Sequence, residues 1–107
     1  MIRAEFFKDR EVLRGFSVTG HAGYGARGFD IVCAGVSSAV QMAANGLTEI
    51  IKAPALVECK DNLVSLRLDM DSIDISGIFM LEALRLQLSL LAESYPESIK
   101  IIITEER

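Results

Sequence analysis

The chain contains five short segments in which apolar residues alternate with polar ones or cluster together, and this pattern predicts β-strands. The predicted strands are residues 2–8, 12–19, 55–60, 63–69 and 98–105. A short charged stretch separates the first two strands, and Asp61 and Asn62 separate the third and fourth. Connections of this length and composition are typical of antiparallel hairpins. We therefore expect two hairpins and a separate fifth strand.

Two longer segments have apolar residues at the spacing of an α-helix. The first runs from Ile31 to about Lys52 and stops before Pro54, and the second covers residues 73–94 and stops before Pro96. The predicted apolar stripe of the first helix consists of Val32, Val36, Ala39, Val40, Ala43, Leu47, Ile50 and Ile51. The predicted order is β-β-α-β-β-α-β. This order indicates one α+β domain over residues 1–107, a mainly antiparallel five-stranded sheet with two helices packed on one face.

The second predicted helix is apolar over an unusually wide arc. Its apolar residues are Ile78, Phe79, Leu81, Leu84, Leu86, Leu88, Leu90 and Leu91. One face of a small sheet is too narrow to bury all of them, so part of this helix or a sheet face is a candidate homodimer contact.

Composition and charge narrow the functional classes. The net charge is −4, which argues against direct binding of nucleic acid and favours a basic partner. The N-terminal residues lack the apolar core of a signal peptide, and the most apolar later stretch is short and interrupted by Glu82 and Arg85. The two cysteines, Cys33 and Cys59, match no metal-ligand spacing. We expect a cytoplasmic protein with reduced thiols, no cofactor, no metal and no membrane contact.

The most distinctive stretch is "GYGARGFDIVC", residues 23–33. Its glycines Gly23, Gly25 and Gly28 form the G-x-G-x-x-G pattern of dinucleotide-binding loops. Such a loop also requires a following parallel strand that ends in an acidic residue, and the hairpins and short chain argue against it. Two interpretations remain open: a mobile loop that covers a catalytic site, or an ordinary long turn between strand and helix.

Two reactive side chains border this loop: His21, the only histidine of the chain, and Cys33. Asp30 stands before the apolar helical run and is a candidate helix N-cap, which puts Cys33 in the first helical turn. The partial positive charge of a helix N-terminus suits an anionic sulfur nucleophile, and imidazole is its usual base. The alternative is that Cys33 is a small core residue and His21 a solvent-facing one.

Residues 20–40, "GHAGYGARGFDIVCAGVSSAV", resemble the signature of the ribosomal-processing cysteine protease family called Prp. Its motif is Gly-His-Ala, a short loop, Asp-Ile-Val-Cys-Ala and a Ser one turn past the Cys. The resemblance implies a catalytic dyad of Cys33 and His21, with supporting roles for Asp30 and Ser37 and a mobile loop at residues 22–29. Asp30 either orients His21 or caps the helix. Ser37 either assists catalysis or is a small residue that allows close packing.

The resemblance also implies a substrate and an assembly. Members of the family remove the N-terminal extension of a large-subunit ribosomal protein, and they are described as homodimers. A basic ribosomal precursor agrees with the acidic charge of this chain. The alternative from another class is a small acidic ribosome-associated binding module that grips a basic segment without cutting it. Such a module needs no reactive thiol.

Overall fold

The computed structural model describes residues 1–20, 29–69, 71 and 74–106, with the backbone alone at residues 29 and 30. The element order is β-β-α-β-β-α-β, as expected, with a short π-helical turn, η1, after the first helix. The elements are β1 Ile2–Asp9, β2 Val12–Thr19, α1 Phe29–Asn45, η1 Gly46–Ile50, β3 Ala55–Lys60, β4 Leu63–Leu68, α2 Ile75–Ser94 and β5 Ile99–Glu105.

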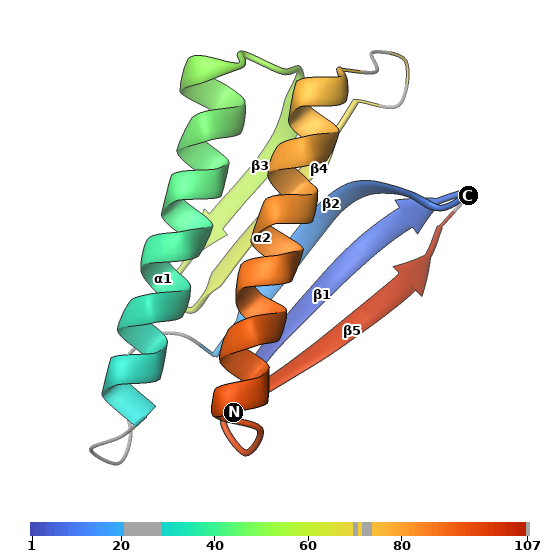
Figure 1. Ribbon diagram of the computed structural model, residues 1–107. Coiled ribbons are helices and arrows are strands. Elements are labelled where there is room, and N and C mark those ends of the chain that lie inside the picture. Colours follow the sequence, from blue (N-terminus) through green and yellow to red (C-terminus); the bar gives the residue numbers. More distant parts are fainter. Residues whose placement is uncertain (21–28, 70, 72–73, 107) are drawn as a thin grey trace.

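The strands form one sheet in the order β3-β4-β2-β1-β5 (Figure 1). Both hairpins pair antiparallel, as does β2 with β4, and only β5 runs parallel to its neighbour β1. The tight turns require backbone with positive φ, at Arg10 (51°) and Glu11 (70°) in the first hairpin and at Asn62 (69°) in the second. The prediction of a mainly antiparallel sheet is confirmed, and β3 and β5 are its two edges.

The two helices run antiparallel and side by side over one face of this sheet (Figure 1). Alternate strand residues point toward them and are fully buried, among them Phe6 of β1, Phe16 of β2 and Leu66 of β4. Val36 and Leu47 from the first helical segment, and Leu81 and Leu88 from α2, close the core from above. This layer therefore holds α1, and with it Cys33, against the sheet.

The first helical segment differs from its prediction at both ends. It begins at Phe29 rather than Ile31, so the backbone of Asp30 is already helical, whereas a cap residue would precede the helix. Its C-terminal part is a π-turn, in which Ile51 N–H donates to the carbonyl of Gly46 at 2.8 Å. A π-turn holds an extra residue and rotates the helix face. Ile50, expected in the buried stripe, is consequently 81% exposed.

The sheet face away from the helices carries a polar network. The guanidinium of Arg67 lies 3.9 Å from the centroid of the Phe7 ring and forms an ion pair with Glu106. The hydrogen bond to Glu106 raises the pKa of Arg67, so this side chain remains charged. Thr104 Oγ1 donates to a Glu5 carboxylate oxygen at 2.6 Å. These contacts connect β1, β4 and the C-terminal segment across the open face.

Part of α2 stays uncovered, as its wide apolar arc predicted. Ile75, Phe79, Leu86 and Leu90 follow one another at helical spacing and are 49–68% exposed. The segments Ile31–Ile50 and Ile75–Ser94 are each long and apolar enough to cross a membrane by length and composition alone. Both belong to the layer that covers the sheet, and core helices of soluble proteins pass the same test.

Candidate active site

Cys33 lies on α1, on the side of the helix that faces the sheet. Its side chain is 1% exposed, and it packs in the core cluster with Val32 and Val36. It is the fifth residue of α1, because the helix begins at Phe29, and it therefore lies at the start of the second turn rather than in the first. The thiol is two residues further from the positive end of the helix than the sequence indicated.

The group next to this thiol is the backbone of Gly20, directly after β2. Cys33 Sγ lies 4.0 Å from the Gly20 carbonyl oxygen, at the limit for a hydrogen bond donated by a thiol. Gly20 immediately precedes His21 in the chain. The structure thus brings the predicted nucleophile to the residue adjacent to the predicted base, from opposite borders of the glycine-rich stretch.

Gly20 itself is held by two neighbouring segments. Its N–H donates to the carbonyl of Asn62, in the β3–β4 turn, at 3.3 Å. Its φ is +85°, and a Cβ at this position would lie 2.4 Å from the carbonyl oxygen of Met1. Only glycine meets both conditions without strain. In the sequence, Gly20 is the first residue of the Gly-His-Ala motif, and its contacts with the thiol and with two other segments were not predictable from its position.

Of the remaining predicted site residues, the structure describes Ser37 in full. Ser37 is half-buried on α1, one turn after Cys33 and on the same helix face. His21 and the loop glycines Gly23, Gly25 and Gly28 lie outside the described residues, as does the side chain of Asp30.

Cys59 belongs to a different environment from Cys33. It is exposed on the edge strand β3, and both cysteines are free thiols. Among the described residues, no group of three or more His, Cys, Asp or Glu side chains is arranged to hold a metal ion. Asp74, in the acidic stretch before α2, acts instead as its N-cap, with a carboxylate oxygen that accepts from Ser76 N–H at 2.8 Å.

Comparison with known proteins gives a consistent picture. The family model of the cysteine protease Prp matches residues 1–100. The crystal structure of SMU.848 from Streptococcus mutans is 31% identical, with a TM-score of 0.84 over 99% of this chain and 96% of that one. The ribosomal processing protease Prp from S. aureus, solved with a substrate peptide, is 23% identical, with a TM-score of 0.84 over 97% of this chain and 100% of that one.

A second structure of the S. aureus protease carries a covalently linked product peptide; it is 24% identical, with a TM-score of 0.80 over 97% of this chain. None of the curated proteins matches this chain. The family model covers nearly the whole chain. In this chain the Cys33 thiol lies beside Gly20, which directly precedes His21, the only histidine of the sequence. The chain belongs to the family of the cysteine protease Prp and is an enzyme of that class.

Proposed function

We propose that this protein removes the N-terminal extension of a large-subunit ribosomal protein, with Cys33 as the nucleophile and His21 as its base. The observation that carries the proposal is the position of the Cys33 thiol, 4.0 Å from the carbonyl of the residue that precedes His21. The membership in the Prp family supports the substrate, and the S. aureus relative is a ribosomal processing protease that was solved with a substrate peptide.

The proposed reaction has two stages. His21 accepts the thiol proton while Cys33 Sγ attacks the scissile carbonyl carbon, and the oxygen becomes an oxyanion. The imidazolium then donates its proton to the leaving amine, which breaks the peptide bond and leaves a thioester. A water molecule gives a proton to His21 and attacks the thioester, which releases the new carboxyl terminus and restores the thiol.

Four further features have proposed roles in this reaction. The first N–H groups of an α-helix have no partner within the helix, so the first turn of α1 offers donors for the oxyanion. Ser37 shares the helix face of Cys33 and is proposed to position the substrate backbone or the thiol. Asp30 is proposed to orient His21. The loop, predicted at residues 22–29 and here shortened because Phe29 already belongs to α1, is proposed to close over the substrate.

The burial of Cys33 agrees with a loop that has to open. A side chain that is 1% exposed is reached by a peptide only when neighbouring groups move away. Glycines suit this role, because they adopt many backbone conformations at little cost. The loop proposal thus supplies a movement that would bring a peptide to the buried nucleophile.

We also propose that the enzyme works in the cytoplasm as a homodimer, without a direct nucleic-acid or membrane contact. The exposed apolar side chains of α2, Ile75, Phe79, Leu86 and Leu90, support a contact with a second copy. The net charge of −4 suits a basic ribosomal protein as the substrate and disfavours phosphate backbones.

The decisive experiment is mass spectrometry of a ribosomal-protein precursor incubated with the wild type, with Cys33→Ala and with His21→Ala. The wild type should release one N-terminal peptide and a mature protein, whereas each variant should leave the precursor uncut, because the thiolate chemistry requires both groups. Cys59→Ser is the matched control and should cleave normally, because it removes only the other thiol, which is exposed on β3, and keeps the backbone N–H and C=O of that strand. Near-normal cleavage by either dyad variant would refute the proposed site.

The same Cys59→Ser protein also separates a protease from a binding module. Cys33 is then the only thiol, so alkylation by iodoacetamide at one site per chain should abolish cleavage. A module that only binds the extension would bind it equally well before and after alkylation of its own thiol, and it would leave the precursor intact in both cases. Labelling rates of the wild type are not informative by themselves, because Cys59 is exposed and Cys33 is buried.

A further inference from the structure

The edge strand β3 is open on both of its sides. Val57 and Cys59 lie on the helix-facing side, since Val57 pairs with the fully buried Leu66 of β4, yet Val57 is 49% exposed and Cys59 is exposed as well. On the other side, Leu56 is 78% exposed. Proteins usually protect an edge of this kind with charge, a proline, a bulge or a covering element. Here an apolar pair stands at the edge in the first half of the strand.

The hydrogen bonds show which backbone groups of β3 are free for another strand. Asp69 N–H donates to the carbonyl of Pro54 at 2.9 Å, which makes this a hydrogen-bonded pair of the β3–β4 ladder. In an antiparallel ladder such pairs alternate, so Leu56 and Glu58 also direct their N–H and C=O toward β4. Ala55, Val57 and Cys59 therefore direct theirs away from the sheet, at the free edge.

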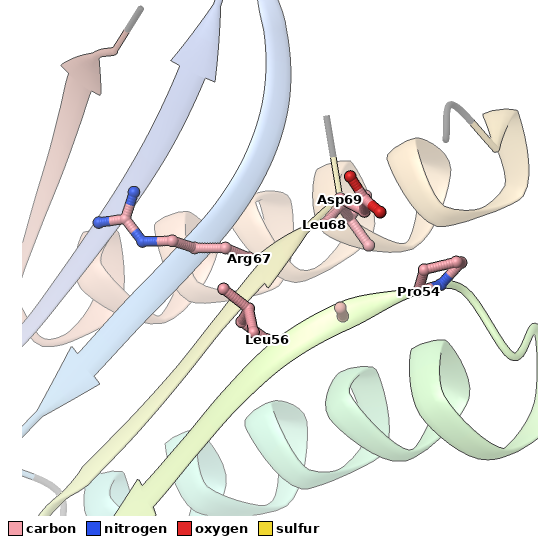
Figure 2. A pocket seen from close by; sticks show the side chains of 6 residues that line it. Pro54, Leu56, Arg67, Leu68 and Asp69 are labelled. Atoms are coloured by element: carbon pink, nitrogen blue, oxygen red, sulfur yellow. The ribbon is translucent and has the colours of Figure 1, made fainter. Parts of the chain in front are cut away.

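This edge leads to the catalytic thiol. The β3–β4 turn holds Asn62, whose carbonyl accepts from Gly20 N–H at 3.3 Å, and the Gly20 carbonyl in turn lies 4.0 Å from Cys33 Sγ. In Figures 1 and 2, α1 runs alongside β3. The other edge, β5, lies at the far side of the sheet, three strands away from β4.

Two hollows lie along β3 where side chains of an added strand would project. The larger one, about 670 Å³, is lined by Pro54, Ala55, Leu56, Arg67, Leu68 and Asp69 (Figure 2). The second, about 340 Å³, is lined by Leu56, Val57, Glu58, Ser65 and Arg67. Asp69 contributes a carboxylate to the larger hollow, whereas Glu58 at the second one forms an ion pair with Lys60, and the charge of Arg67 is balanced by Glu106. The edge thus combines apolar contacts with one carboxylate, that of Asp69, which suits a basic peptide.

We infer that the precursor extension binds in extended form along the free edge of β3, as an additional strand that delivers its scissile bond to Cys33. Strand addition is an established mode of peptide recognition, in which backbone hydrogen bonds supply affinity and alternate side chains supply specificity. The inference rests on the proposed function and deepens it, because it names the surface that holds the substrate. Val57 is the central residue, since its N–H and C=O both point to the incoming chain.

Val57→Pro tests this inference with little damage to the fold. Proline lacks the N–H at the edge, but the ladder to β4 does not use that group, and edge strands tolerate such prolines. We expect KM for the precursor peptide to rise roughly three- to tenfold, the usual effect of a lost hydrogen bond, while kcat stays within about twofold. Val57→Ala, which keeps the N–H, should raise KM less.

The matched control is a proline on the opposite edge. Ile103 of β5 is 45% exposed, and the bonds Ile2 N–H to Ser98 and Glu106 N–H to Lys8 show that even-numbered residues of β5 face β1. The N–H of Ile103 therefore also points outward. Ile103→Pro should leave KM unchanged, whereas equal KM values for the wild type and both proline variants would overturn the inference.

A substrate-side experiment gives the answer even if Val57→Pro does not fold. Peptides in which one backbone amide at a time is replaced by an ester lose one N–H donor each, and they are assayed with the unaltered enzyme. Binding along β3 predicts that KM rises at every second position, because alternate residues of a strand face its neighbour. An even profile would overturn the inference. A second result would also overturn it. If Val57→Pro keeps the KM of the wild type but no longer forms an oligomer, β3 is a contact between copies of the chain. Absence of cleavage by the wild type would instead refute the proposed function.

Discussion

At the scale of single residues, the site depends on a glycine as much as on the reactive side chains. Gly20 carries the carbonyl next to Cys33 Sγ, and its N–H is bound by Asn62. Its positive φ and the close approach of Met1 leave no room for a side chain. A substitution here therefore affects the geometry of the site through the backbone, without altering the thiol or the imidazole.

Gly20→Ala should lower the free energy of unfolding by about 1–3 kcal/mol, because a non-glycine residue in this conformation is strained. It should also reduce kcat, since the strand end that precedes His21 shifts. Urea denaturation and peptide cleavage measure the two effects.

The matched control for this substitution is Gly35→Ala, within α1. A Cβ at Gly35 meets only Leu91 Cδ1 at 3.8 Å, an ordinary contact, and alanine is a better helix former than glycine. This variant should be as stable as the wild type or more stable. If both variants lose similar stability, the strain attributed to Gly20 is not the cause.

At the scale of elements, the π-turn η1 decides which apolar residues of the first helical segment enter the core. Leu47 is fully buried and Ile50 is 81% exposed, although both fit the apolar stripe of a regular helix. After the turn the chain leaves the helix at Lys52, whose φ is +58°, and Ala53 N–H donates to the Leu47 carbonyl at 2.9 Å. These bonds close the helix end over the core.

Leu47→Ala and Ile50→Ala should therefore differ sharply in stability. Loss of the buried Leu47 side chain should cost about 2–5 kcal/mol, since it removes apolar contacts and leaves a cavity. Ile50→Ala should change the free energy of unfolding by less than about 0.5 kcal/mol. Thermal or urea unfolding of the two proteins measures this difference, and equal losses would show that Ile50 is buried in solution.

At the scale of the whole molecule, α2 leaves an apolar surface uncovered. The sheet supplies one face for two helices, and α2 is apolar on more sides than that face covers. The opposite sheet face, in contrast, is occupied by its own network of Arg67, Phe7 and Glu106. The exposed side of α2 is therefore the surface on which we expect a second copy.

Leu86→Glu should dissociate the proposed homodimer, because it places a charge in the middle of the exposed stripe of α2, between Phe79 and Leu90. Light scattering after size-exclusion chromatography at micromolar concentration measures the mass. Gln87→Glu adds the same charge at the neighbouring exposed polar position and should remain dimeric. A monomeric wild type would contradict the homodimer.

The hydrophobic pattern by itself determined the strands, the two helices and their order, because strand and helix periodicities are local properties of the chain. Independently of the family resemblance, the positions of Cys33 and His21 at the two borders of one loop also identified them as candidates. Only the tertiary structure decided that β5 pairs parallel to β1, that Cys33 lies in the second helical turn beside Gly20, and that β3 leaves Val57 open at the edge. These features depend on contacts between segments far apart in the chain, and no local pattern of residues specifies them.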